Sequence, residues 1–177
     1  MTEIENQCLE TFPEWLKTLG SDATELAKVV GSDAPDGVRR YAAAALNYLF
    51  KSLDLIPDGI EDLGYLDDAF VLRVASARAM ADTSDDMAPD MARMAKQAKL
   101  IESLLEDDYA RLETYVDKLT RGAARGRTVD EIVTDETIQR EFLNEVNGWA
   151  ASYEAPSFAK DEKNLVKLRS FLSAKLP

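Results

Sequence analysis

The sequence predicts an all-α protein, a multi-helix bundle of about seven or eight helices. Three observations predict this class. Apolar residues recur at helical spacing along the 177-residue chain, strand-like alternation is missing, and Ala, Leu, Glu, Lys and Met prevail over β-branched residues. Hydrophobic residues make up 46% of the chain, so a core can be buried.

The N-terminal segment contains several helix start and stop signals. Residues 3–19 are expected to form one helix or two, because Pro13 can occupy the first turn of a new helix that Gly20 closes. The sequence Asp22-Ala-Thr-Glu25 resembles a capping box, which predicts a short separate helix over residues 23–30.

Three longer helices are predicted next: from Pro35 to about Leu53, from about Leu66 to Ala81, and from about Asp86 to Arg121. The long helix near 86–121 carries an apolar stripe with one stutter in its spacing. The stripe favours either a bundle helix buried along one face or a homodimeric coiled-coil seam. Its members are Met87, Met91, Met94, Ala98, Ile101, Leu105, Tyr109, Leu112, Val116 and Leu119.

The segment "RGAARGRT", residues 121–128, is interpreted as a linker. Its three arginines suit either a phosphate group or a helix C-terminus, where the dipole favours cations. A capping box at Thr128–Glu131 and a cap at Asp135 predict a helix to about Tyr153, and a last helix follows over 161–174. We therefore expect a helical bundle over 1–121 and a helical hairpin over 128–177, packed on the same domain.

Charge and residue types exclude several function classes. The net charge is −12, and residues 1–90 alone hold 18 acids and seven bases. This charge argues against nucleic-acid binding and against docking on anionic lipid, and it favours a basic protein partner. The chain has no histidine and its single cysteine is Cys8, so histidine-dependent nucleophile systems and cysteine-rich zinc sites are excluded. The acidic N-terminus "MTEIENQ" does not resemble a signal peptide, and we expect a cytoplasmic protein.

The stretch "SLDLIPDGIEDLGYLDDAFVL", residues 52–72, holds six carboxylates between Asp54 and Asp68. Pro57 ends the preceding helix, and the many apolar residues predict a compact joint that is plugged into the core. Ordinary structural roles can explain four of the acids, as caps, turn acceptors and first-turn residues that complement a helix dipole. Glu61 and Asp62 can be solvated.

A divalent cation is the competing interpretation of the same acids. Mg²⁺ or Ca²⁺ prefers oxygen ligands, and several carboxylates in one turn can supply them. The spacing does not fit an EF-hand loop. The candidate metal ligands are Asp54, Asp58, Asp67 and Asp68.

Residues 48–72, "YLFKSLDLIPDGIEDLGYLDDAFVL", resemble the signature of the YkvA-like family, domain of unknown function 1232. Its members read close to S-P-I-D-L-I-P-D, an apolar turn, and G-x-L-D-D. Leu53 stands where the family has proline, and Glu61 and Asp62 make the turn more polar than usual. Some relatives are thought to associate with membranes through that turn. The resemblance implies no activity, because none is established for the family, so Asp54, Asp58, Asp67 and Asp68 match motif positions rather than catalytic roles.

These observations favour a non-enzymatic structural or protein-interaction module with no cofactor. The first alternative is a metal-binding module or metal-dependent enzyme that uses the acidic joint. The second is peripheral membrane association through its apolar residues.

Overall fold

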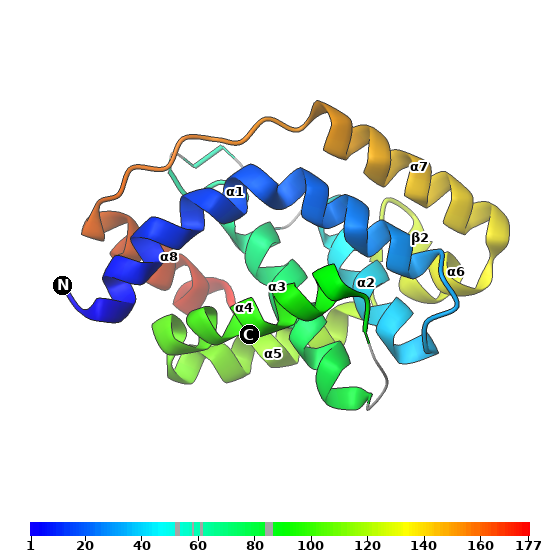
Figure 1. Cartoon of the computed structure of the whole chain (residues 1–177), viewed down its shortest axis with the longest axis horizontal. Coiled ribbons are helices and arrows are strands. Elements are labelled where there is room, and N and C mark those ends of the chain that lie inside the picture. Colours follow the sequence, from blue (N-terminus) through cyan, green and yellow to red (C-terminus); the bar gives the residue numbers. More distant parts are fainter. Residues whose placement is uncertain (52–53, 58, 61, 84–86) are drawn as a thin grey trace.

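A computed structural model describes residues 1–51, 54–57, 59–60, 62–83 and 87–177. It confirms the all-α prediction, because the described residues are 74% helical and almost without strand (Figure 1). The helices of the described residues are α1 (Glu3–Val30), α2 (Asp36–Tyr48), α3 (Leu66–Asp82), α4 (Pro89–Leu105), α5 (Asp107–Leu119), α6 (Val129–Thr134), α7 (Glu136–Ser152) and α8 (Glu162–Lys175).

Helix α1 is one continuous helix of 28 residues, so the predicted stop at Gly20 and the separate helix over 23–30 are wrong. One buried stripe runs without interruption along its whole length, and burying that stripe outweighs the local stop signals. Pro13 lies inside the helix. Asp22 is not a cap but a buried residue of the helix interior, 1% exposed.

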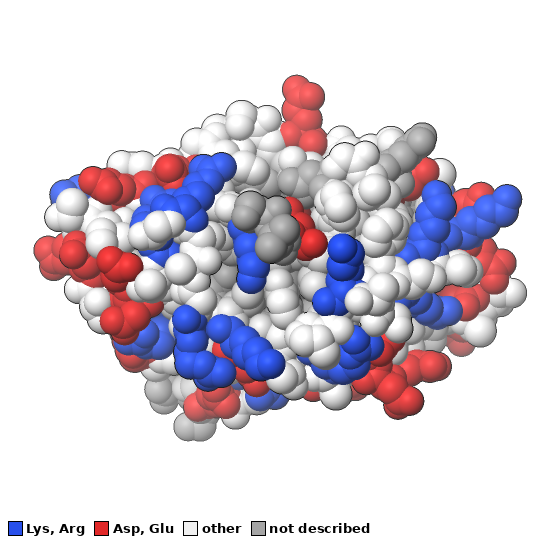
Figure 2. Space-filling view, turned by 180° about the vertical axis from the view of Figure 1, so that it is seen from behind, with Lys and Arg blue, Asp and Glu red and all other residues white. Residues whose placement is uncertain are grey.

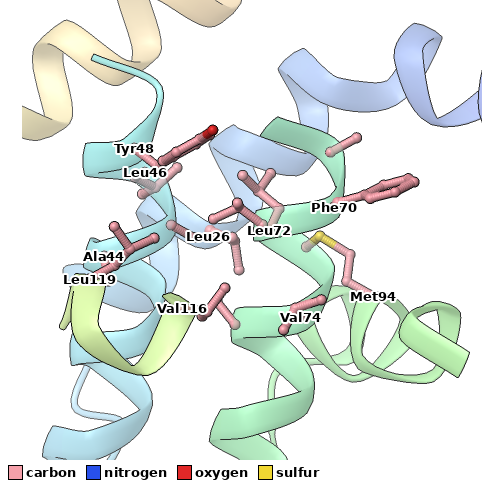
Figure 3. Close-up of a cluster of buried hydrophobic side chains, with 14 of the residues drawn as sticks. Leu26, Ala44, Leu46, Tyr48, Phe70, Leu72, Val74, Met94, Val116 and Leu119 are labelled. Atoms are coloured by element: carbon pink, nitrogen blue, oxygen red, sulfur yellow. The ribbon is translucent and has the colours of Figure 1, made fainter. Parts of the chain in front are cut away.

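Helix α3 is the centre of the bundle. It contacts α1, α2, α4 and α5, and every residue from Leu66 to Ser76 is buried. Figure 3 shows side chains of α1, α2, α4 and α5 converging on it. The labelled members of this cluster are Leu26, Ala44, Leu46, Tyr48, Phe70, Leu72, Val74, Met94, Val116 and Leu119. Polar side chains on a helix that is surrounded in this way must find their hydrogen-bond and charge partners inside the protein.

The predicted long helix near 86–121 is wrong, because it is broken at Glu106 into α4 and α5. Glu106 has φ 53° and ψ −118°, a conformation incompatible with a helix. The break lies between Leu105 and Tyr109, where the stripe stutters, and it lets α4 cover α1 and α3 while α5 covers α2 and α3. The stripe is buried in the chain's own core except for Met87, which is partly buried against it. A homodimer through this segment stays a prediction.

Helix α2 ends at Tyr48, earlier than the predicted Leu53, which lies outside the described residues. The predicted linker contains a short hairpin of β1 (Ala123–Ala124) and β2 (Arg127–Thr128). The caps predicted at Thr128 and Asp135 are both confirmed.

The C-terminal helices pack on α1 at separate places. Helix α7 lies along α1, and an extended segment, residues 153–161, then leads to α8 near the other end of α1 (Figure 1). Asp161 caps α8 through the Lys163 amide. The division into 1–121 and 128–177 stays a prediction. No described helix has the length and apolarity that crossing a membrane requires.

Gly20 is a point of close approach between α1 and α7. A Cβ atom there would lie 3.2 Å from the Ala150 carbonyl oxygen and 3.5 Å from the Tyr153 ring, whereas a Cβ at Gly148 of α7 would meet nothing within 4 Å. We therefore expect Gly20→Val to lower the free energy of unfolding by about 1–3 kcal/mol. Gly148→Val, the same change in an open helical position, should leave it nearly unchanged or raise it slightly. Urea denaturation checks both, and equal effects would contradict this packing.

Candidate functional site

The joint between α2 and α3 is held by the side chains of Tyr48 and Asp67. The Tyr48 hydroxyl donates to Asp67 Oδ2 at 2.6 Å and accepts from the Leu55 amide at 2.8 Å. The Ile56 amide donates to the same carboxylate oxygen at 3.3 Å. Two consecutive backbone amides of the motif are therefore bound by one phenol and one carboxylate from the two flanking helices. The next residue, Pro57, has no amide hydrogen to satisfy.

The apolar residues of the joint point inward, as the sequence predicts. Leu55 is 4% exposed, and Ile56 and Leu63 are fully buried. The turn after Pro57 is stabilised by backbone bonds from the Ile60 amide to the Pro57 carbonyl and from the Gly64 amide to the Ile60 carbonyl. These described apolar residues of the joint thus belong to the core, whereas Leu53 lies outside the described residues, and membrane association through the joint stays a prediction.

Asp62 and Tyr65 take unusual backbone conformations, with φ 66° and 68°. Asp62 is not simply solvated, because its Oδ1 accepts the Ala159 amide at 3.0 Å and so ties the segment before α8 to the joint. The Tyr65 ring packs edge-on against Tyr153, with ring centroids 5.5 Å apart. Both strained residues therefore anchor the C-terminal part of the chain on the joint.

The four predicted metal ligands have different positions. Asp67 and Asp68 are buried in the first turn of α3, and Asp67 serves the joint as described. Asp54 is half-buried. Burial, followed by the charges of Asp54 and Asp67, raises the pKa of Tyr115 to about 12, so these two carboxylates lie near one phenol. Asp58 lies outside the described residues.

The described residues contain no group of three or more acidic or cysteine side chains that could hold a metal ion. Because Asp58 is not among them, the metal site stays a prediction. One of the four candidate ligands, Asp67, already accepts hydrogen bonds at Oδ2 from the Tyr48 hydroxyl and the Ile56 amide. A cation that binds this oxygen would have to compete with these two donors.

A second buried polar cluster joins α3 to α1 and α4. Arg73 is fully buried and donates to Asp22 Oδ2 at 3.0 Å and to Gln97 Oε1 at 2.9 Å. Its guanidinium also stacks on the Trp15 ring, 4.2 Å from the centroid. Arg93 donates to the other oxygen of Asp22 at 2.7 Å. One buried carboxylate therefore receives two guanidinium groups.

The charge of Arg73 depends on this cluster. Burial lowers the pKa of Arg73 to about 10, and Asp22 offsets part of that effect. The guanidinium thus remains charged at neutral pH, and a buried charge needs its counter-ion. The Thr18 hydroxyl completes the cluster by donating to Asp22 Oδ2 at 2.9 Å.

Sequence reasoning missed Tyr48, Asp22 and Arg73 as structural partners. One signal was present: Arg73 interrupts the apolar run "AFVLRVA", and a charge in such a run indicates a buried ion that needs a partner. The partner itself lies 51 positions earlier, inside a predicted capping box. No local pattern identifies it.

Two of the three arginines in residues 121–128 lie over aromatic rings. Arg125 lies over the Phe50 ring at 4.8 Å from the centroid, and Arg127 lies over Phe142 at 5.0 Å and pairs with Glu145. These two side chains stack on aromatic rings rather than cover the C-terminus of α5. Figure 2 views the molecule from behind the view of Figure 1. On that face lysine and arginine side chains are spread over the surface, and acidic side chains lie mainly toward its edges.

An acid-lined groove of about 410 Å³ lies where the start of α1 meets the corner between α4 and α5; we call it the corner groove. Its lining combines three apolar side chains with three carboxylates. The lining includes Ile4, Glu5, Leu104, Leu105, Glu106 and Asp108. Arg169 also lines it and lies 3.4 Å from Glu5.

Glu106 presents its side chain from a strained corner. Its φ of 53° and ψ of −118° match the first central position of a type II′ turn, which strongly favours glycine. A side chain in such a conformation costs about 1–3 kcal/mol. The chain therefore holds an exposed carboxylate at the groove although glycine would fit the backbone better.

Comparison with known proteins gives one match. Residues 38–73 match the model of a family described as "Protein of unknown function (DUF1232)". No curated protein and no solved structure matches the chain. The matched segment runs from α2 through the joint to Arg73, so it contains Tyr48, Asp67 and the residue that Asp22 neutralises.

Removing the carboxylate of Asp22 should be strongly destabilising. Asp22→Asn leaves the Arg73 charge buried without its counter-ion, and we expect the free energy of unfolding to fall by about 3–5 kcal/mol. The control is Asp36→Asn, which breaks an ion pair with Arg40 at an exposed carboxylate and should cost less than about 1 kcal/mol. Chemical denaturation measures both, and similar small losses would contradict the role of the buried cluster.

Removing the Tyr48 hydroxyl should destabilise the protein in a pH-dependent way. Burial, followed by the charges of Asp67 and Asp68, raises the pKa of Tyr48 above its ordinary value. The neutral phenol thus contributes stability fully below about pH 10, and this stability is lost as pH rises further, because the unfolded chain then releases the proton first. Tyr48→Phe should cost about 1–3 kcal/mol at pH 7, since two buried groups lose a hydrogen-bond partner.

The difference between Tyr48→Phe and the unaltered protein should narrow above about pH 10, where only the latter carries this titration. Urea melts between pH 7 and pH 11 measure it. Tyr115→Phe is the matched control, because no hydrogen bond of its hydroxyl is found among the described residues, and it should change stability by less than about 0.5 kcal/mol at pH 7. A constant difference across the pH range would contradict the role assigned to Tyr48.

Proposed function

We propose that the chain is a non-enzymatic protein-interaction module. In this proposal residues 38–73, which match the DUF1232 family model, are the structural brace, and the corner groove binds a basic segment of a protein partner. The family has no assigned activity. The proposal therefore depends on what the residues of this chain can do.

The buried charged side chains of the family segment, residues 38–73, support a bracing role. Asp67 binds Tyr48 and a backbone amide, and Arg73 binds Asp22 and Gln97. Both side chains are fully buried. Groups that are buried and engaged in this way stabilise one conformation of the α2–α3 hairpin, which leaves recognition to the outer surface.

The corner groove is the observation that carries the proposal. The partly exposed Ile4 in its lining can receive the aliphatic part of a lysine or arginine side chain, and a carboxylate can receive the charged end. Glu5 and Asp108 enter from two different helices, while Glu106 stands between α4 and α5. Glu5 pairs with Arg169 and Asp108 with Arg111, so the exposed Glu106 is the carboxylate best placed to receive a cationic side chain.

The strain at Glu106 gives the proposal a distinctive consequence. Where function requires a side chain that the backbone disfavours, removing it stabilises the fold and weakens the function. Glu106→Gly should therefore raise the free energy of unfolding by about 0.5–1 kcal/mol, because glycine adopts this conformation without strain. The same substitution should weaken binding of a basic partner.

The test uses a short synthetic peptide rich in lysine and leucine, with affinity measured by fluorescence anisotropy. Glu106→Gly and Glu106→Gln should each weaken binding about fivefold, the effect expected from losing one ion pair of about 1 kcal/mol. Glu141→Gln, which removes an exposed carboxylate from α7 instead, is the control for net charge. Equal affinities of Glu106→Gln and Glu141→Gln, or no binding at all, would refute the proposal.

A further inference from the structure

The corner groove continues along α1 and α4 into a second cavity. This cavity has a volume of about 290 Å³ and shares Ile4 and Ser103 with the corner groove. Both cavities are lined by residues 2–15 and by residues 96–108, so together they follow the seam between the two helices. From Lys96 to Leu105, α4 rises about 14 Å, which equals the length of roughly ten helical residues.

The two ends of this seam carry opposite charge. Lys96 and Lys99 line the second cavity and are exposed, whereas Glu106 and Asp108 line the corner groove. Between the ends the lining mixes apolar and uncharged polar side chains, with Ile4 and Leu100 beside Gln7, Thr11 and Ser103. The seam is thus a bipolar groove: a channel of mixed lining with two lysines at one end and, at the other, carboxylates together with Arg169.

We propose that the bipolar groove binds an amphipathic helix of a partner protein, with basic side chains over Glu106 and acidic side chains over Lys96 and Lys99. The inference rests on the proposed function and specifies its partner. A channel between two packed helices receives a third helix through apolar residues spaced three and four apart. A fully basic segment would meet repulsion from the two lysines, so the charge pattern selects a helix with charges of both signs.

The helix dipole assigns a direction to the bound segment. Its N-terminus carries partial positive charge and its C-terminus partial negative charge. The favourable orientation therefore places the N-terminus at Glu106 and the C-terminus at Lys96. Basic residues near the N-terminus of the partner helix and acidic residues near its C-terminus face groove charges of opposite sign, although this order opposes the dipole of the partner helix itself.

The experiment compares two synthetic helical peptides that share one leucine face. The bipolar peptide has lysines at its N-terminal end and glutamates at its C-terminal end, and the basic peptide has lysines at both ends. The unaltered protein should bind the bipolar peptide about fivefold more tightly, the effect of two surface ion pairs in place of repulsion. The double variant Lys96→Glu/Lys99→Glu should reverse this preference. Lys163→Glu/Lys167→Glu on α8 makes the same charge change at exposed positions outside the groove and should preserve it.

The outcomes separate the two proposals. A basic peptide that binds as tightly as the bipolar one, with a preference unaffected by Lys96→Glu/Lys99→Glu, would overturn the helix inference and leave the proposed function standing. Binding of neither peptide would overturn both. A proline in the middle of the bipolar peptide should abolish its binding if the bound form is helical, and unchanged affinity would overturn the inference.

Discussion

The complete burial of the first half of α3 is the constraint on which the rest of the structure depends. Every residue from Leu66 to Ser76 is buried, although three of them are charged. Buried ionic groups are tolerated only when partners surround them. For Asp67 these partners come from α2 and the joint, and for Arg73 they come from α1 and α4. The bundle is therefore fastened at both ends of this buried stretch by polar contacts that apolar packing alone would not specify.

The family segment, residues 38–73, does not contain every partner that its buried charges need. Residues 38–73 contain both halves of the first contact, Tyr48 and Asp67. They contain only one half of the second, because Arg73 needs Asp22 of α1. An isolated α2–α3 hairpin would expose the apolar face of α3 and leave the guanidinium without its counter-ion. The helices outside the matched segment thus supply a requirement that the segment itself creates.

The sequence predicts those features that depend on neighbouring residues. The helical class, the caps at Thr128 and Asp135, and the inward joint follow from local spacing and capping chemistry. The continuity of α1 does not, because Gly20 resembles a helix stop but serves a close approach to α7. The role of Asp22 does not either, since its partners lie 51 and 71 residues away.

The candidate site shows the same limit. The sequence drew attention to acids of the joint, yet Asp67 is engaged internally, and Asp62 ties down the segment before α8. The acids of the corner groove come from distant parts of the chain, and neither Glu5 nor Glu106 stands out locally. The only local signal was the stutter in the spacing of the apolar stripe, which coincides with the break between α4 and α5 at Glu106. Local spacing can locate such a break, but it cannot show which surface the break assembles.

The braced core also explains how the chain can hold strained residues at its surface. Asp62, Tyr65 and Glu106 adopt positive φ angles without being glycine. Each costs about 1–3 kcal/mol, a substantial part of the stability of a typical domain. Asp62 and Tyr65 offset this cost with contacts to the C-terminal segment. Glu106 donates its amide to Glu102 and accepts the Tyr109 amide, and the corner that it forms lets α4 cover α1 and α3 while α5 covers α2 and α3. Glycine would make the same corner without strain, so the exposed carboxylate is the one feature of Glu106 that the corner itself does not require, and it is the group that the proposed partner would engage.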